Sequence, residues 1–443
     1  MILGLQAFNK ELRRDIIRHM LDIKFIRENS DLIKLAATKK HLSFDVDTLV
    51  SLDQKRLDTL KNIEDLRAKQ NFASEKLAQV SMIERNDIIE SMRPIKEELK
   101  RQEEQMEEIM KEWRVLMLSV PNIPDMSVPE GGSDADNLEV KTWGEFPTFS
   151  FEPLDHITLM EGGDMVDFER GTKTSGFRGY FLKNDGAMLE MAVWQYAMQR
   201  WQNKGFTPML VPSLVKREAL LGTGYLPQGE DDLYKDGNDY MAGTGEVATM
   251  FYHSDEILNQ SELPKKYIVW SPCFRKEAGS HGKDVKGLVR VHEFYKCEQV
   301  VLCEASHEMS VNFHEEIRDN AEKMMEELGI PYHTVINCGG DLGLGQVKKY
   351  DIEAWMPSQQ KYRETHSASY FHDFQTRRLN IRYKESDGKI RYAHSLNNTA
   401  AATPRLITTI IENYQQADGT IKVPDVLIPF MGGKTVIGKA FRV

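Results

Sequence analysis

The stretch that decides the fold covers residues 274–298 and reads FRKEAGSHGKDVKGLVRVHEFYKCE. It places six lysines and arginines among three glycines, and the β-rich runs YIVWSPCF (residues 267–274) and EQVVLCE (residues 298–304) flank it. These runs predict two strands joined by a long glycine-containing loop. Because a guanidinium group stays charged and can bridge two oxygens, the hairpin could hold phosphate groups, although a solvated charged loop would show the same composition.

Length and composition limit the possible functions. A chain of 443 residues with 41% hydrophobic content is long enough for two domains. Its net charge of −11 argues against a protein that coats nucleic acid without specificity. The four cysteines have neither paired spacing nor a histidine pattern typical of zinc sites, so we expect a reducing, cytoplasmic environment.

The start of the chain carries no recognisable targeting signal. Residues 1–19 are arginine-containing but also acidic and lack serine, which makes them a poor transit peptide. We interpret them as an extension of unclear role, because Met20 would itself serve as a natural start. No apolar run is long enough to predict a membrane span, and we expect a soluble chain.

Residues 47–118 contain no glycine and repeat apolar side chains at helical spacing. The pattern predicts a helical hairpin with a coiled-coil seam and a turn near residues 81–86. Pro94 should kink the second arm or mark its first turn. The seam of the first arm is Leu60, Ile63, Leu66, Gln70, Ala73, Leu77 and Val80, and that of the second is Ile88, Met92, Ile95, Leu99, Gln102, Met106, Ile109, Trp113 and Leu116.

The hairpin has no basic excess that would identify a nucleic-acid partner. Between Ser51 and Val120 there are 15 acidic and 13 basic residues. Periodicity alone therefore favours a packed hairpin or a dimerisation coiled coil over an RNA-binding arm.

The composition changes after a segment that contains Pro121, Pro124, Pro129 and the run GGSDAD (residues 131–136), which we interpret as a linker. An apolar-striped helix should follow over residues 187–204, with Gly205 as its stop. The runs RLNIRYK (residues 378–384) and VLIPFM (residues 426–431) are β-rich. Without regular strand–helix alternation or a nucleotide-binding glycine motif, an α+β fold built on an antiparallel sheet fits best.

Several segments together resemble the class II aminoacyl-tRNA synthetases, and specifically the seryl-tRNA synthetase family. FRKEAG with VRVHEFYKCE resembles the family's motif 2, and HSLNNTAAATPRLITTIIENYQ (residues 394–415) resembles motif 3. MLVPSLV (residues 209–215) supplies the proline of motif 1, Pro212, and DFQTRRLNIRY (residues 373–383) resembles a further family segment. The resemblance, which includes the helical arm, covers almost everything from Met20 onward.

The resemblance implies a fold and a domain order. It implies a class II catalytic domain at residues 126–443, with a six- or seven-stranded antiparallel sheet. Residues 20–125 would form a tRNA-binding domain whose coiled-coil arm covers about residues 48–117. It also implies a homodimer built partly on motif 1.

The resemblance further implies a site for ATP and magnesium. Arg275 would contact the α-phosphate and the serine carboxylate, and Arg405 the γ-phosphate, so these two are the expected catalytic residues. Adenine would bind Glu277 and stack on Phe294. The implied ATP-binding set is Arg275, Lys276, Glu277, Val291, Phe294, Glu364, Thr365, His366, Ser367 and Arg405, in which Glu364 and Ser367 would hold Mg²⁺, a cation that prefers oxygen ligands.

For L-serine the resemblance implies a small polar pocket. Its carboxylates would neutralise the amino group and accept from the hydroxyl, so that alanine would leave buried polar groups unpaired. The implied residues are Thr244, Gly245, Glu246, Arg275, Glu298 and Thr399.

The implied activity is that of a serine–tRNA ligase, which forms seryl-adenylate from ATP and then loads the 3′ end of serine tRNA. The partner would be recognised through its long variable arm, and selenocysteine tRNA is a second possible substrate. Two alternatives remain: a homologue that loads a carrier protein, which would usually lack the arm, and a non-catalytic paralogue, which would have lost Arg275, Glu277, Glu298 or Arg405.

Overall fold

The computed structural model describes residues 22–77, 81–279, 284 and 286–441. By contacts between residues the chain divides into two units. The first contains Lys39–His41 and Asn122–Val443 and is called the catalytic body below, and the second contains Met20–Thr38 and Leu42–Pro121 and is called the arm unit. No helix in the described part of the chain has the length and apolar content needed to cross a bilayer.

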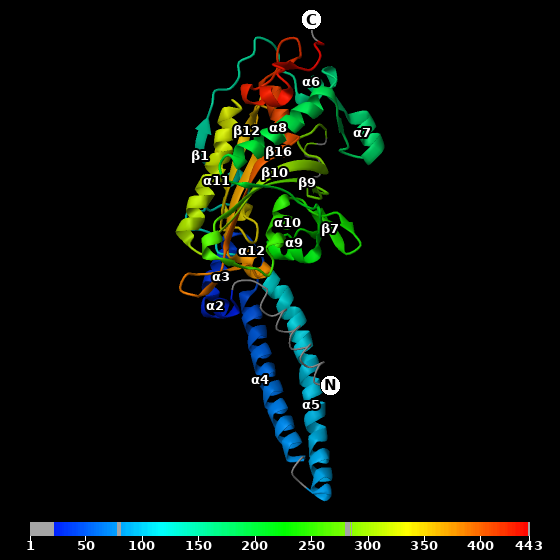
Figure 1. The fold of residues 1–443 in the computed structure, drawn as a ribbon, viewed down its shortest axis with the longest axis vertical. Helices are drawn as coiled ribbons and strands as arrows, with labels where there is room; N and C mark the ends of the chain where they lie inside the picture. The colour runs from blue at the N-terminus through cyan, green and yellow to red at the C-terminus, as the bar shows by residue number, and fades with distance from the viewer. Residues whose placement is uncertain (1–21, 78–80, 280–283, 285, 442–443) are drawn as a thin grey trace. The chain divides into compact units, whose positions relative to one another are not determined.

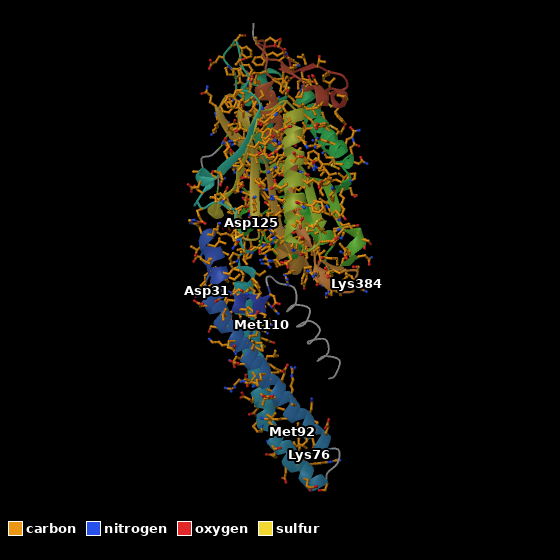
Figure 2. All side chains as sticks on the ribbon, turned by 90° about the vertical axis from the view of Figure 1, so that its left-hand side faces the viewer. Asp31, Lys76, Met92, Met110, Asp125 and Lys384 are labelled. Atoms are coloured by element: carbon orange, nitrogen blue, oxygen red, sulfur yellow. The ribbon has the colours of Figure 1, made fainter. Side chains whose placement is uncertain are left out.

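The arm unit consists of helices. Two short helices, α2 (Ile23–Glu28) and α3 (Ser30–Lys39), precede the long pair α4 (Val46–Leu77) and α5 (Met82–Leu118), which run side by side (Figures 1 and 2). The predicted hairpin is therefore present, but residues 82–86, expected in the turn, are helical because Ser81 and Glu84 form a capping box that starts α5. Pro94 lies inside α5, well beyond its first turn.

One buried carboxylate joins α4 to α5. Asp53, on α4, is fully buried, and its Oδ1 accepts from the indole nitrogen of Trp113 at 3.0 Å and from Nε of Arg56 at 2.8 Å. A nitrogen of Arg27 lies 3.0 Å from the other oxygen. Further along the pair, Arg67 donates to Glu103. The buried carboxylate of Asp53 is thus paired with hydrogen-bond donors and cations, which offsets the cost of burying its charge.

The catalytic body is built on a sheet that contains eight strands in the described residues, in the order β1-β11-β12-β13-β16-β10-β9-β4. All neighbouring strands in it are antiparallel except β4 and β9, which are parallel. The antiparallel expectation holds for the sheet as a whole, while the expected six or seven strands become eight. In sheet order the strands are Leu138–Trp143, Tyr332–Ile336, Lys348–Met356, Lys361–His372, His394–Thr403, Glu293–Cys303, Lys265–Phe274 and Thr207–Leu210.

Three helices supply much of the core that packs against one face of this sheet: α8 (Asn184–Gln202), α11 (His307–Glu327) and α13 (Arg405–Asn413) (Figure 1). Side chains alternate along a strand, so β10 directs Cys297 and Val301 into this core. The residues that alternate with them point to the other face of the sheet. Val300 and Leu302 pack instead with Met250 of α10 (Gly245–Tyr252) and Leu379 of α12 (Phe374–Leu379).

The remaining elements are short. The helices are α6 (His156–Gly162), α7 (Phe168–Ser175) and α9 (Arg217–Thr223). The small sheets pair β2 (Val166–Asp167) with β3 (Phe181–Leu182), β17 (Ile421–Lys422) with β18 (Val436–Ile437), β5 (Leu214–Lys216) and β6 (Lys235–Asp236) with β7 (Asp239–Met241), and β8 (Ile257–Asn259) and β15 (Ile390–Tyr392) with β14 (Arg382–Lys384). The 3-10 turns are Asp134–Asp136, Glu230–Asp232, Gln260–Glu262, Gly339–Asp341 and Asp425–Met431.

Three local predictions were wrong. The run VLIPFM lies in a 3-10 helix, in which Pro429 has no N–H to offer a strand ladder. In RLNIRYK, Arg378 and Leu379 end α12, Asn380 caps it in the left-handed region at φ 57°, and only the last residues form β14. The expected linker is packed structure: Asn122 donates its side-chain amide to the carbonyls of Gly345 and Phe371.

Candidate active site

A pocket of about 420 Å³ opens on the sheet of the catalytic body. Three neighbouring strands line it with alternate residues: β10 with Phe294, Lys296 and Glu298, β16 with Asn397 and Thr399, and β13 with Ser367, Ser369 and Phe371. The period-two alternation of strands explains why these residues share one face.

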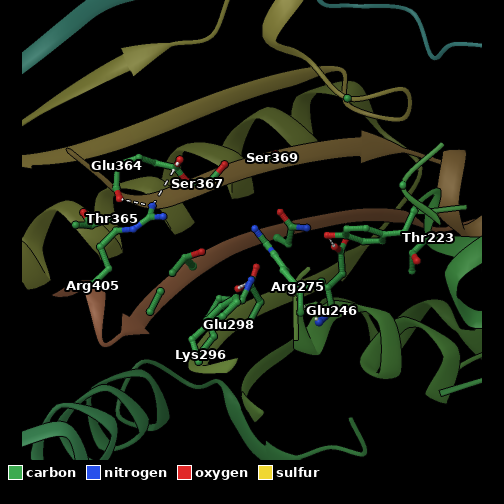
Figure 3. Close-up of a pocket in the computed structure, with 18 of the residues that line it drawn as sticks. Thr223, Glu246, Arg275, Lys296, Glu298, Glu364, Thr365, Ser367, Ser369 and Arg405 are labelled. Atoms are coloured by element: carbon green, nitrogen blue, oxygen red, sulfur yellow. Dashed lines mark hydrogen bonds and ion pairs between the residues drawn. The ribbon is translucent and has the colours of Figure 1, made fainter. Parts of the chain in front are cut away.

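The pocket brings together most of the residues singled out in the sequence. Thr244, Glu246, Arg275, Glu277, Val291, Phe294, Glu298, Glu364, Thr365, Ser367, Thr399 and Arg405 all line it. Figure 3 shows Arg405 beside Glu364 at one end, Glu246 and Thr223 at the other, and Arg275 between them. The two arginines, 130 positions apart in the chain, thus point into one cavity.

Three predicted residues do not line the pocket. The side chain of His366 is buried, and its ring nitrogens lie near the carbonyl of Ala400 (3.1 Å) and the hydroxyl of Thr365 (2.9 Å). Lys276 is exposed, with its ammonium group over the ring of Tyr234. Gly245 is the first residue of α10, where a Cβ would approach Ser271 and Val269 to 2.9 Å.

Arg405 is the first residue of α13, two positions after the end of β16. Its guanidinium donates to the carbonyls of Glu364 at 2.7 Å and Val289 at 3.1 Å, and lies 3.8 Å from the Glu364 carboxylate. Loss of part of its hydration opposes ionisation of Glu364, whose side chain is half exposed, but the cations of Arg405, Lys349 and Arg275 outweigh this cost and lower the pKa of the carboxyl group. This end of the pocket therefore holds fixed positive charge around one ionised carboxylate, an arrangement suited to a polyphosphate and its cation.

Arg275 occupies the middle of the pocket. Its guanidinium contacts the carbonyl of Gly243 at 3.3 Å and lies over the ring of Phe294, 5.4 Å from the ring centre. Next to it, Glu277 takes φ 55° and accepts from Arg290 at 2.5 Å. An arginine held by one carbonyl and one ring keeps donors for a ligand that carries negative charge.

The opposite end is a pocket of buried carboxylates. Burial raises the pKa of Glu246 to about 7, even though Gln375 donates to the carboxylate at 2.7 Å. Burial likewise raises the pKa of Glu298, against the attraction of Lys296, whose ammonium group lies 2.6 Å away. Tyr225 donates to the second oxygen of Glu246 at 3.3 Å. Small, buried and acidic, this end suits a ligand with an ammonium group.

The sequence interpretation missed Lys296, Gln375, Asn397 and Tyr225 among the pocket residues. Lys296 had a signal, because it stands two residues from both Phe294 and Glu298 on a predicted strand. Gln375 and Asn397 lie on separate elements, and only the packed fold brings both to Glu246.

Comparison with known families agrees with this geometry. The class II tRNA synthetase core domain (G, H, P, S and T) matches residues 230–414, and the seryl-tRNA synthetase N-terminal domain matches residues 20–124. The fold and the pocket thus define a class II aminoacyl-tRNA synthetase.

Individual relatives are more specific. Serine–tRNA ligase of Deinococcus radiodurans is 43% identical over 96% of this chain and all of its own length. Seryl-tRNA synthetase from Pyrococcus horikoshii, solved with ATP, superposes with a TM-score of 0.87 at 38% identity, covering 95% of this chain and 100% of that one. The cytoplasmic enzyme from Naegleria fowleri, solved with AMP, gives 0.82 at 32% identity, covering 95% and 99%. The chain belongs to the seryl-tRNA synthetase family, and it catalyses the ATP-dependent ligation of serine to tRNA.

Proposed function

We propose that the pocket binds ATP at the end formed by Arg405 and Glu364 and serine at the end formed by Glu246 and Glu298, with Arg275 at the point where they react. The observation that carries this assignment is the separation of charge along one cavity, with cations at one end and buried carboxylates at the other. Below, these are called the ATP end and the serine end.

The first reaction needs no general acid or base from the protein. The serine carboxylate attacks the α-phosphorus, the bond to the bridging oxygen breaks, and pyrophosphate leaves. Negative charge builds on the α-phosphate oxygens as the new bond forms. Arg275 stabilises that charge because its guanidinium is held in place before the reaction begins.

Arg405 binds the γ-phosphate, while Glu277 accepts from the adenine amino group and Phe294 stacks on the base. Phe294 lines the pocket beside the Arg275 guanidinium, so a planar base stacked on its ring would also lie close to that cation. Val291 and Thr365 belong to the proposed ATP set because they line the pocket, and Lys276 and His366 belong to it only through the resemblance of their motifs.

Serine recognition rests on Glu246 and Glu298, with Thr244 and Thr399 as hydroxyl partners beside them. The ammonium group of serine would pair with a carboxylate that burial otherwise holds partly protonated. Its hydroxyl would complete the hydrogen bonds of the pocket, which alanine cannot do. Because Gly245 has no side chain, the start of α10 can lie close to strand β9.

Residues that fit Mg²⁺ lie at the ATP end. Glu364 and Ser367 offer hard oxygen ligands on the pocket wall. Asp351 pairs with Ser367 across β12 and β13, and burial and the charge of Glu364 raise its pKa to about 6 against the pull of Lys349. A divalent cation would relieve this repulsion and neutralise phosphate charge. Since the described residues contain no metal-binding group of three or more His, Cys, Asp or Glu, ATP oxygens would complete its shell.

We also propose a homodimer formed through the segment that follows α7 (residues 176–182), α8 and β4. Large apolar side chains are exposed there: Phe177 (56%), Phe181, Met188, Met191 and Leu210 (75%). Strand β4 is an edge of the main sheet, and an exposed apolar edge needs a cover. Sedimentation of the purified protein and of Met191→Glu tests this proposal, and a monomeric parent protein would refute it.

The arm unit would bind the long variable arm of serine tRNA by its shape and backbone, as is usual for RNA helices. A cytoplasmic location fits the four buried, unpaired cysteine thiols. Selenocysteine tRNA is a second proposed substrate. Charging of the purified selenocysteine tRNA transcript with serine tests this proposal.

The decisive test is pyrophosphate exchange with ATP and each proteinogenic amino acid, followed by charging of total tRNA. We expect exchange with serine alone to be robust, and transfer to appear only with serine isoacceptors. Exchange without transfer to any tRNA would favour the carrier-loading homologue instead.

A further inference from the structure

Lys40 is a buried lysine that pairs with no carboxylate in the part of the chain that the structure describes. Its side chain is 2% exposed, and its ammonium group donates to the carbonyls of Gly343 at 3.0 Å, Leu344 at 2.8 Å and Gln346 at 2.6 Å. Burial alone lowers the pKa of Lys40 well below its ordinary value. All three N–H donors of the ammonium group therefore serve one short loop.

Asn122 completes the binding of that loop. Its side-chain amide donates to the carbonyl of Gly345 at 3.0 Å, and its backbone N–H donates to Leu344 at 2.9 Å. Four successive carbonyls, from residue 343 to residue 346, thus accept from Lys40 or Asn122. Both residues belong to the catalytic body by their contacts. Because carbonyl dipoles that converge on one point repel each other, the loop depends on these donors for its conformation.

The loop 343–346 is a wall of the pocket. Gln346 closes it by accepting from the N–H of Gly343 at 2.6 Å, and donates to the hydroxyl of Ser369 at 2.8 Å. Ser369 stands opposite Asn397 on the neighbouring strand, and Asn397 stabilises the Glu246 carboxylate. The contacts of Lys40 therefore continue through Gln346, Ser369 and Asn397 to Glu246, which lies at the serine end.

Close packing fixes the other side of the loop. A Cβ on Gly345 would come within 2.5 Å of the Phe374 ring on α12. Gln375, the next residue of α12, donates to Glu246. A shift of the loop would therefore press on the helix that orients a serine-pocket carboxylate.

We infer that Lys40 is a positioning residue for the serine end of the pocket: by holding the carbonyls of residues 343–346, it fixes the wall against which serine and the adenylate made from it would lie. The inference rests on the assignment of the serine end made above. Lys40 itself does not line the pocket and contacts no reacting group.

The test uses the full-length chain with Lys40→Met, which keeps the length of the side chain and removes the donors. Lys39→Met is the matched control, because the ammonium group of Lys39 pairs with the exposed Glu130 at 3.4 Å. We expect Lys40→Met to raise KM for serine about tenfold and to slow single-turnover transfer by a similar factor, with KM for ATP within about twofold of the parent. Lys39→Met should change none of these constants.

A purely structural role predicts a different result. In that case Lys40→Met would lower the melting temperature, and after correction for the fraction of active sites KM for serine would equal that of the parent, which overturns the inference. Equal increases in KM for serine and ATP would overturn it as well.

Two further variants keep the test decisive if Lys40→Met does not fold. Asn122→Ala, which acts on the same loop, should raise KM for serine selectively, and Lys40→Arg should retain more serine affinity than Lys40→Met. An unchanged KM for serine in Asn122→Ala would contradict the inference. Failure of the parent enzyme to exchange with serine would instead refute the proposed function.

Discussion

The ammonium group of Lys296 lies 2.6 Å from the carboxylate of Glu298, and both side chains are buried in the wall of the pocket. The pair occupies positions two apart on β10, so both residues face the cavity. In the free enzyme, burial favours the protonated form of Glu298, and the ammonium group of Lys296 opposes this by stabilising the ionised carboxylate.

Replacing Lys296 with methionine should therefore weaken serine binding. Without the cation, the pKa of Glu298 rises further, and the carboxyl group is protonated over a wider pH range. We expect KM for serine in pyrophosphate exchange to rise about tenfold or more near neutral pH, and to fall again as pH increases. Lys286→Met, on the exposed part of the same hairpin, is the control, and an effect of the same size there would rule out this explanation.

The two arginines of the pocket should fail in different ways. Arg275→Ala removes a cation from the reacting centre, so we expect exchange to fall by about 10³-fold or more with serine binding partly retained. Arg405→Ala removes the partner of Glu364 at the ATP end and should raise KM for ATP much more than KM for serine. Ordinary exchange in Arg275→Ala would remove its assignment. Arg391→Ala, a half-exposed arginine paired with Glu385, should be neutral.

The buried Glu246 makes the stability of the free enzyme depend on pH. Its pKa is about 7 in the folded state and about 4.5 in the unfolded chain, so the folded state holds a proton between these values that the unfolded state has released. The free energy of unfolding therefore falls as pH rises from 4.5 to 7. The full difference is about 3 kcal/mol.

Glu246→Gln, which cannot ionise, should remove that part of the pH dependence. In thermal melts without ligand, the variant should gain stability relative to the parent protein between pH 5 and pH 8. A constant difference across this range would show that Glu246 does not titrate as described. Saturating serine should reduce the effect in the parent, since its ammonium group favours the ionised carboxylate.

Removal of residues 48–117 separates the two reactions. Every residue that lines the pocket lies outside this segment, so exchange with serine should stay within about twofold of the parent protein. Aminoacylation of tRNA should fall by at least about 10²-fold, because the deletion removes the surface proposed to bind the variable arm of the tRNA. Equal loss of both activities would mean that the deletion damages the catalytic body, and circular dichroism of the variant checks its folding.

Periodicity was enough to predict the arm and the hairpin around the pocket, because both depend on local spacing. The heptad pattern of the second arm identified Met106, Ile109 and Trp113, which are buried as expected. Turn and strand assignments failed where a cap or a proline decided the backbone, as at Ser81 and Pro429. Such features override the hydrophobic pattern.

The pocket was predictable only where residues share a motif. Arg275, Glu277 and Glu298 lie in one stretch of sequence and were found together. Nothing in the sequence marks Lys40, whose partners are backbone carbonyls about 300 positions away and therefore have no residue type of their own. Asn122 stands between two prolines and was therefore assigned to a linker. Its partners, too, are backbone carbonyls far along the chain.

The buried carboxylate of Asp53 has a consequence for the arm unit. Sliding α4 against α5 by one turn would separate Asp53 from the indole of Trp113 and leave a desolvated charge without one of its donors. This cost disfavours neighbouring registers of the helix pair. The distance from Asp53 to the far end of the pair is therefore fixed. One aspartate thus fixes the register of a long helix pair, and with it the reach of that pair.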